Sequence, residues 1–321
     1  MGVTILSTGK ALPELVVGNK KMEELVETDN QWIIDRTGIE ERCIATKETG
    51  LDLAVAAAKE ALGDMDKDTI ELVLVATVTP DAIVPSMGSL VKRALGLKNA
   101  IAYDINAACS GFIYGTWNAE ALMKTYGIKR GMVIGVERLT RITNWEDRGT
   151  CVLFGDGAGC CILELTDEKP GILASFVKNY DDVSNVLTVD MEYLRTPFAD
   201  DGKKEQYIHM NGTQVFRFAV GAIGEVMDAV LQKAGIKADD VKYYVPHQAN
   251  MRIIQAAAQR LKQPIEKFQV SIRTTGNVSA ASVPMALTDL MKSGKVHSGD
   301  KIMLVGFGGG LTAGAILFEA L

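Results

Sequence analysis

The stretch AIAYDINAACSGFIYGTWNAEALM, residues 100–123, decides the fold, because it passes from an apolar strand through a short turn into a helix. The β-rich run AIAYDI predicts the strand, and the pattern from Cys109 to Tyr126 predicts the helix. A strand followed directly by a helix is the repeating unit of sheets that are joined by crossover helices. We therefore expect an α/β protein.

The same alternation extends outward from this stretch on both sides. Before it, the pattern predicts strands or helices at VTILSTG 3–9, LDLAVAAAKEALG 51–63, IELVLVATV 70–78 and SLVKRALG 89–96. After it come the strand GMVIGVE 131–137 and a pair of strands, CVLF 151–154 and GCCILEL 159–165, around a GDGAG turn. This order predicts a mostly parallel sheet in the first half of the chain.

A second half repeats the pattern after the linker TDEKPG 166–171. It contains LASFV 173–177, a polar region from Tyr180 to Glu205, a helix 214–234, YYVPH 243–247, a helix 248–261, VSI 270–272, a helix 279–291 and KIMLVGFGGG 301–310. Strand, glycine turn and strand occur in both CVLFGDGAGCCILEL and MLVGFGGGLTAGAILFEAL. We expect two related halves, 1–168 and 169–321.

Composition narrows the class of protein. The chain has 321 residues and a formal net charge of -6, which argues against a nucleic-acid or anionic-membrane surface. Its N-terminus has neither a signal peptide nor a membrane span, and its 5 cysteines without a C-x-x-C pair fit free thiols in a reducing compartment. We expect a cytoplasmic protein with no metal site and no cofactor.

Cys109 is the first candidate for chemistry, because it stands where the strand ends and the helix begins. A helix N-terminus offers free N–H groups and a partial positive charge, both of which favour a thiolate. The simpler interpretation is a small apolar residue in a crowded turn, as expected for Cys43, Cys151, Cys160 and Cys161.

Two further residues follow strands or turns in the second half. His247 in YYVPHQAN lies at the carboxyl end of a predicted strand, the edge where α/β sites assemble. Asn277 in TTGNVSAASVP belongs to a turn that leads into a helix, where its amide could face the same site; taken alone, it is more simply explained as a turn or cap residue. His209 and His297 lack such a setting.

Two glycine-rich segments are candidate ligand sites. VGFGGGLTAG lets the backbone approach a ligand and donate N–H groups to an oxyanion, but it lacks the Lys-Ser or Lys-Thr ending of a phosphate loop. GDGAG at 155–159 is followed by a strand and not by a helix, which favours a turn over a nicotinamide site.

Taken together, NAACSGF, VPHQAN and GNVSAASVP, with DRGT, FGDGAG and FGGG, closely resemble β-ketoacyl-acyl carrier protein synthase III over nearly the whole chain. The resemblance implies a thiolase-like fold of two pseudo-repeated halves in αβαβα layers, and usually a homodimer. It implies an acyltransferase that moves an acyl-CoA primer to a cysteine and condenses it with malonyl-acyl carrier protein at the start of fatty-acid synthesis.

The same resemblance assigns roles to individual positions. Cys109 would be the nucleophile, His247 and Asn277 would stabilise the enolate formed on decarboxylation, and the N–H groups of Cys109 and Gly309 would form the oxyanion hole. A thiolate both accepts and releases an acyl group, and decarboxylation needs hydrogen-bond donors more than a base.

Binding residues are implied in the same way. Trp32, with Arg148 opposite and Arg36 near the phosphates, would hold coenzyme A. The remaining implied contacts are with the pantetheine arm at Gly212, Phe216 and Asn250, and with the carrier protein at Arg217 and Arg252. Val84 stands where some members carry a larger aromatic residue at the end of the acyl pocket, so the primer is left open.

Two alternatives remain at this point. A cysteine hydrolase has Cys, His and Asn in the same order, but the C-G-S-C-W signature is missing here. A related thiolase-fold acyltransferase of secondary metabolism would share every motif.

Overall fold

A computed structural model describes residues 2–167, 171–182, 184–190, 198 and 206–321. Two mixed sheets form its framework. In the first sheet the strand order is β1 (Gly2–Ala11), β7 (Asp156–Thr166), β6 (Arg130–Arg138), β4 (Leu72–Ala76) and β5 (Ile101–Ile105). In the second sheet the order is β11 (Tyr243–Pro246), β12 (Lys301–Gly308), β13 (Thr312–Glu319) and β8 (Ile172–Asn179).

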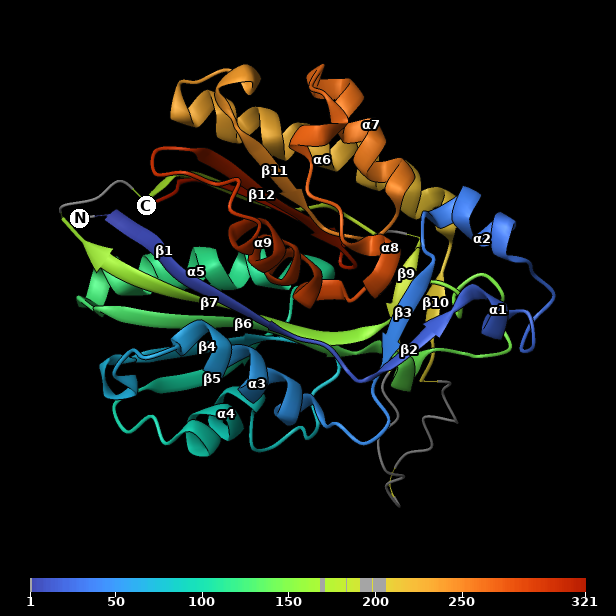
Figure 1. Ribbon diagram of the computed structural model, residues 1–321, viewed down its shortest axis with the longest axis horizontal. Coiled ribbons are helices and arrows are strands. Elements are labelled where there is room, and N and C mark those ends of the chain that lie inside the picture. Colours follow the sequence, from blue (N-terminus) through green and yellow to red (C-terminus); the bar gives the residue numbers. More distant parts are fainter. Residues whose placement is uncertain (1, 168–170, 183, 191–197, 199–205) are drawn as a thin grey trace.

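Helices separate and cover the two sheets, as Figure 1 shows. The outer layer on the first sheet consists of α3 (Gly50–Leu62) and α4 (Met87–Leu95), and the outer layer on the second consists of α6 (Gly212–Ala234) and α7 (Met251–Leu261). Between the sheets lie α5 (Gly111–Tyr126) and α9 (Ser282–Lys292), each of which contacts both. The layer order is therefore αβαβα, as the sequence led us to expect.

The shared middle layer explains why α5 is apolar on more than one side. Phe112 and Ile113 of α5 are fully buried in one cluster with Leu74 of the first sheet and Leu304 of the second. Burying a side chain of this size contributes about 1.5–3 kcal/mol. The two sheets thus share one core through this helix.

Smaller elements complete the described chain. They are β2 (Leu15–Gly18), α1 (Asn19–Met22), α2 (Asn30–Thr37), β3 (Glu41–Ile44), β9 (Leu187–Val189), β10 (Ile208–Met210), α8 (Ile272–Thr275) and six short 3₁₀ turns, which are Lys67–Thr69, Ala108–Ser110, Leu139–Ile142, Ala238–Asp240, Ile265–Lys267 and Ser279–Ala281. In the parts of the chain with described coordinates, no helix is long and apolar enough to cross a bilayer.

The predicted mostly parallel sheet is confirmed for the strand directions: in the first sheet β1, β6, β4 and β5 run in one direction and β7 alone is reversed, and in the second sheet β13 alone is reversed. The following local predictions failed. CVLF 151–154 is not a strand, and GDGAG is not a turn: β7 already begins at Asp156, and its antiparallel partner is β6. The buried carboxylate of Asp156 holds this segment straight by accepting N–H groups from Ala45 and Thr140.

VSI 270–272 is also not a strand. Ile272 begins the short helix α8, and the only sheet-like contact near it is an isolated bridge between Phe268 and Tyr244 among the residues described. The proposed division after residue 168 stays a prediction, because residues 168–170 lie outside the described residues. The part of the polar region at 191–197 and 199–205 lies outside them too.

Candidate active site

Cys109 lies in the 3₁₀ turn Ala108–Ser110 that joins β5 to α5. The preceding Ala108 has a left-handed φ of 44°, which turns the chain sharply and directs the cysteine away from the sheet. Gly308 at the end of β12 allows a close approach, since a Cβ there would lie 2.6 Å from the backbone nitrogen of Cys109. The two halves therefore meet at this sulfur.

The electrostatic setting of Cys109 is opposite to the one predicted. Its side chain is reached only partly by solvent and is otherwise enclosed by protein, and this burial raises the pKa of the thiol to about 12. The buried carboxylate of Glu137 acts in the same direction, whereas the Ser279 hydroxyl opposes it. Desolvation therefore opposes the effect of the helix start, which favours a thiolate. The resting residue is a thiol.

His247 follows β11 and is held on three sides. Its backbone N–H donates to Val305 at 2.7 Å, its Nδ1 lies 2.6 Å from the Ser282 hydroxyl, and its ring contacts Phe307 edge-on at 5.0 Å. Burial lowers the pKa of the imidazole to about 3, so the ring is neutral at physiological pH.

Ser282 is the hydrogen-bond partner of Nδ1 of His247. The Ser282 oxygen also accepts the backbone N–H of Gln248 at 3.3 Å. In the tautomer with the proton on Nε2, the Ser282 hydroxyl donates to Nδ1. Nε2 has no hydrogen-bond partner in the protein as far as its residues are described, so it is available as a donor.

Asn277 is fixed by backbone contacts to the loop before β7. Its N–H donates to Leu153 at 2.9 Å, and its carbonyl accepts from Gly155 at 3.0 Å. Its side-chain oxygen accepts the N–H of Ser279 at 2.9 Å, which settles the orientation of the amide because that backbone group can only donate. The NH₂ group of the Asn277 amide therefore points away from the Ser279 N–H.

These three side chains share one cavity. A cavity of about 750 Å³ is lined by Cys109, His247 and Asn277, together with Gly309, whose N–H meets no acceptor in the described chain. Its other walls are largely apolar and include Leu187 and Phe216. A thiol, a neutral imidazole N–H and an amide NH₂ thus face a single space that is large enough for an acyl chain.

The predicted coenzyme A residues divide into two groups. Gly212, Phe216 and Asn250 line the cavity, whereas Trp32, Arg36 and Arg148 do not. The guanidinium of Arg148 lies 4.1 Å from the centre of the Trp32 ring, and that of Arg36 lies at 5.9 Å. A stacked base needs about 7 Å between its two partners, which is twice a van der Waals contact, so Arg148 must move before a ring can enter.

Asn250 has a structural role as well. It is the N-cap of α7, where its Oδ1 accepts the N–H of Arg252 at 2.9 Å, and its Nδ2 donates to the carbonyl of Arg36 at 2.9 Å. It therefore joins α7 to α2 at the edge of the cavity.

The two arginines predicted for the carrier protein lie on the outer helices. Arg217 of α6 is exposed. Arg252 of α7 is exposed as well, and its guanidinium lies 5.6 Å above the ring of Phe216. Arg252 thus lies beside the side of the cavity that Phe216 lines.

The predicted acyl-pocket position of Val84 stays a prediction, because the structure contains one chain. Its side chain is 83% exposed and does not line the cavity, whereas the neighbouring Ile83, 75% exposed, does. Within one chain, Val84 is therefore outside the space that the acyl group would fill.

Three polar residues around the site were not among those that the sequence predicted: Glu137, Ser279 and Ser282. All three are buried. In the sequence, Glu137 is marked only as the charged residue that ends the apolar run GMVIGVE. The two serines belong to the motif that contains Asn277. Serine spacing does not show which hydroxyls turn inward.

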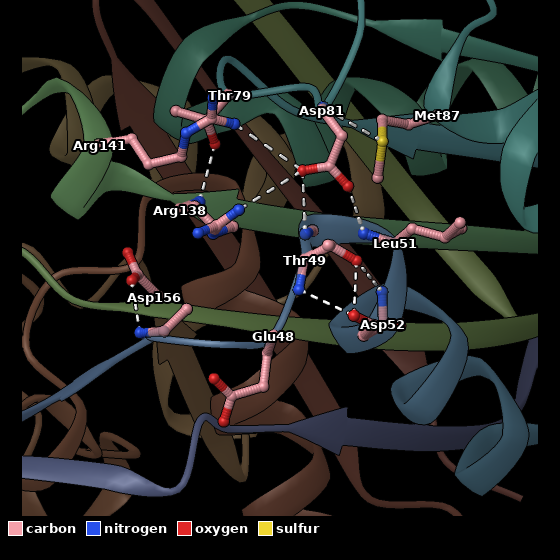
Figure 2. Close-up of polar contacts among 12 residues, drawn as sticks. Glu48, Thr49, Leu51, Asp52, Thr79, Asp81, Met87, Arg138, Arg141 and Asp156 are labelled. Atoms are coloured by element: carbon pink, nitrogen blue, oxygen red, sulfur yellow. Dashed lines mark hydrogen bonds and ion pairs between the residues drawn. The ribbon is translucent and has the colours of Figure 1, made fainter.

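The Thr79 hydroxyl links the Glu137 carboxylate to the backbone of Arg138. The Thr79 hydroxyl accepts the backbone N–H of Arg138 at 2.8 Å and donates to Glu137 at 2.6 Å. The Arg138 guanidinium points toward Asp81 (Figure 2). Its Nη1 lies 3.8 Å from the Asp81 carboxylate, which accepts the N–H groups of Gly50 and Leu51 at the start of α3.

Comparison with known proteins gives a consistent result. The family model described as 3-oxoacyl-[acyl-carrier-protein (ACP)] synthase III matches residues 103–181, and that of its C-terminal part matches residues 231–320. A β-ketoacyl-[acyl-carrier-protein] synthase III of Clostridium beijerinckii is 44% identical over 99% of both chains.

Solved structures agree with these sequence matches. The 3-oxoacyl-[acyl-carrier-protein] synthase III of Aquifex aeolicus has a TM-score of 0.93 and 42% identity, over 99% of this chain and 100% of that one. The priming β-ketosynthase of the R1128 polyketide pathway has a TM-score of 0.92 and 32% identity, over 99% and 96%.

Proposed function

The chain belongs to the β-ketoacyl-acyl carrier protein synthase III family, a family of condensing acyltransferases with the thiolase-like fold, and from this premise we propose what its own residues do. An acyl-CoA primer transfers its acyl group to Cys109, and the acyl group then condenses with malonyl-acyl carrier protein. The observation that carries the proposal is the meeting of Cys109, His247 and Asn277 in one largely apolar cavity.

In the first step the sulfur of Cys109 attacks the carbonyl carbon of the primer thioester. The negative charge that develops on the carbonyl oxygen needs donors, and the free N–H of Gly309 beside Cys109 supplies one. The backbone N–H of Cys109 is the second donor in this proposal. Gly308 supports the arrangement because any side chain there would separate the two segments.

In the second step malonyl-acyl carrier protein loses carbon dioxide and forms an enolate. Nε2–H of His247 and the NH₂ group of Asn277 donate to its oxygen. The lowered pKa of His247, about 3, suits this role, because a neutral ring remains a donor at every physiological pH and does not quench the carbanion as an acid.

Coenzyme A binds across the mouth of the cavity in this proposal. The pantetheine arm passes Gly212, Phe216 and Asn250, while the adenine enters between Trp32 and Arg148 and the phosphates lie near Arg36. Arg217 and Arg252, both exposed beside the cavity, dock the acidic carrier protein.

We further propose a homodimer formed through β5, the edge strand of the first sheet. Ile101 and Tyr103 of β5 are 62% and 38% exposed, which is unusual for large apolar side chains on an edge strand. The Asp104 carboxylate at the end of β5 accepts the N–H of Met87 at the start of α4, so the exposed Ile83–Val84 loop before α4 continues the same apolar surface.

A cytoplasmic location and a role in primary fatty-acid synthesis complete the proposal. The five cysteines are free thiols, as expected in a reducing compartment. Condensation in a secondary pathway is the alternative, since the polyketide priming enzyme shares the fold and 32% identity.

The test separates the two steps. His247→Ala and Asn277→Ala should each lower condensation by about 10²–10³-fold, because each removes one oxyanion donor, while labelling of Cys109 by acyl-CoA persists. His297→Ala, an exposed histidine outside the cavity, is the control and should change neither step. Loss of labelling together with condensation would contradict the assigned roles.

A further inference from the structure

Two buried hydroxyl groups, on Ser110 and Thr312, lie 2.6 Å apart beside the site, and the two steps above leave them without a role. Ser110 ends the 3₁₀ turn that contains Cys109, and Thr312 begins β13. The two residues are 202 positions apart in the chain. Their contact therefore joins the first half of the protein to the second, next to the nucleophile.

The Ser110 hydroxyl does not make the contact that its place in the chain favours. Ser110 is the N-cap of α5, where a serine usually accepts an N–H group of the first helical turn. Among the described residues it makes no such bond, and its hydroxyl lies 2.8 Å from the carbonyl of Ala107 as well as beside Thr312. The hydroxyl is thus used between the halves of the chain and not to cap the helix.

The Thr312 hydroxyl lies within reach of two carbonyls, that of Gly309 at 3.1 Å and that of Ala107 at 3.3 Å. If Ser110 donates to Thr312, the Thr312 proton is free for Gly309, and one chain of hydrogen bonds runs from the turn to the glycine loop. If Thr312 donates to Ser110, Ser110 donates to Ala107. In both arrangements Thr312 is bonded to the turn that contains Cys109.

The backbone around the two hydroxyls is closely packed. Gly308 is paired with Thr312 in the register of β12 and β13, and a Cβ on Gly308 would lie 2.6 Å from the backbone nitrogen of Cys109. A Cβ on Gly309 would lie 3.7 Å from the Cβ of Ala108. A shift of Thr312 is therefore passed on to the glycine loop and to its distance from Cys109.

We propose that the hydroxyl pair of Ser110 and Thr312 holds the N–H groups of Cys109 and Gly309 in the position that binds the oxyanion of acyl transfer. This inference rests on the proposed function, in which those two N–H groups bind the carbonyl oxygen. Ser110 and Thr312 act through them and are therefore positioning residues. A displacement of about 1 Å in a reacting site can cost roughly 10²-fold in rate, so a lost hydroxyl has a measurable effect.

The test compares two reactions of Cys109, acetylation by acetyl-CoA in a single turnover and alkylation by iodoacetamide, both followed by intact mass and assigned by peptide mass. Acetylation passes through an oxyanion, whereas alkylation displaces iodide and forms none. Thr312→Val removes the hydroxyl and should slow acetylation about 10–10²-fold, without changing alkylation or the half-saturating concentration of acetyl-CoA. Thr312→Ser keeps the hydroxyl and should retain most of the rate.

Ser110→Ala tests the same contact from the first half of the chain. It should also slow acetylation and leave alkylation unchanged, and the double variant with Thr312→Val should lose less than the product of the two single losses. Thr288→Val is the control, because it removes a fully buried hydroxyl that donates to the Pro284 carbonyl at 2.8 Å within α9. Both of its rates should equal those of the natural protein.

The outcomes separate this inference from the proposed function. If the natural protein forms no acetyl adduct on Cys109, the proposed function fails. If it does, but Thr312→Val and Ser110→Ala acetylate at the natural rate, or lose acetylation and alkylation equally, the positioning role is overturned and the proposed function stands. Melting temperatures verify folding, and if Thr312→Val does not fold, the two rates of Ser110→Ala decide.

Discussion

The polar atoms of the site are oriented by neighbours that use up their other hydrogen-bonding capacity. Ser282 engages Nδ1 of His247, and the N–H of Ser279 engages the oxygen of Asn277. What remains on each residue is one donor edge toward the cavity. A pair of donors fixed before the reaction needs no reorganisation when the negative charge forms.

The buried carboxyl of Glu137 predicts a stability that depends on pH. Its pKa is raised from 4.5 to about 7 by burial, so between these values the folded protein holds a proton that the unfolded chain has lost. The stabilisation is complete below pH 4.5 and is lost as the pH rises through 7. Between pH 4.5 and 8, the free energy of unfolding of the natural protein should fall by about 3 kcal/mol relative to Glu137→Gln.

Urea unfolding of both proteins at several pH values measures this difference. A difference that stays constant from pH 4.5 to 8 would show that the carboxyl is not buried as described.

At the scale of elements, the hairpin β12–β13 matters because it brings the second half against Cys109. Gly308→Ala would place a methyl group 2.6 Å from the backbone nitrogen of Cys109, so that either the hairpin or the 3₁₀ turn must move. We expect a loss of about 1–3 kcal/mol of stability and of most of the acylation rate. Thermal unfolding and single-turnover labelling measure the two effects.

Gly221→Ala is the matched control for this substitution. Gly221 lies in α6, is exposed and has no atom within 4 Å of the added Cβ. Alanine there should stabilise the protein by about 0.5–1 kcal/mol and leave acylation unchanged. Equal losses in the two variants would remove the special role of position 308.

The sequence alone predicts those elements whose hydrophobic pattern lies within one continuous segment. The helices that became α5, α6 and α9 were predicted because apolar residues recur with helical spacing. The strand predicted at 151–154 failed because an apolar run carries no information about partners: Cys151 and Val152 pack beside Ile33, and β7 starts only at Asp156. Pairing across a sheet is decided by residues that are distant in the chain.

The same distinction explains the site. Cys109, His247 and Asn277 could be found because each follows a strand or turn within a recognisable motif. The raised pKa of Cys109 could not, since it depends on how residues from the two halves pack together.

At the scale of the whole molecule, the chain forms five layers (Figure 1). The residues that follow β5 and β11 line one cavity. The nucleophile Cys109 therefore comes from the first half, and His247 and Asn277 come from the second. Neither half alone contains the complete set. The core that the two sheets share through α5 holds the halves together.

The exposed edge of the first sheet predicts an oligomer. Ile101→Lys places a charge at the centre of the proposed β5 interface and should convert the homodimer to monomers in sedimentation velocity. Leu173→Lys on β8, which is 39% exposed at an edge of the other sheet, is the control and should leave the dimer intact. Unchanged sedimentation of Ile101→Lys would show that β5 is not the interface.

Intact-mass measurement of the protein mixed with acetyl-CoA, and then with malonyl-acyl carrier protein, tests the central claim most directly. The natural protein should gain one acetyl group, Cys109→Ser should gain none, and the carrier protein should discharge the adduct as a β-ketoacyl product. An adduct that persists in Cys109→Ser, or one that water discharges while the carrier protein stays unchanged, would contradict the account.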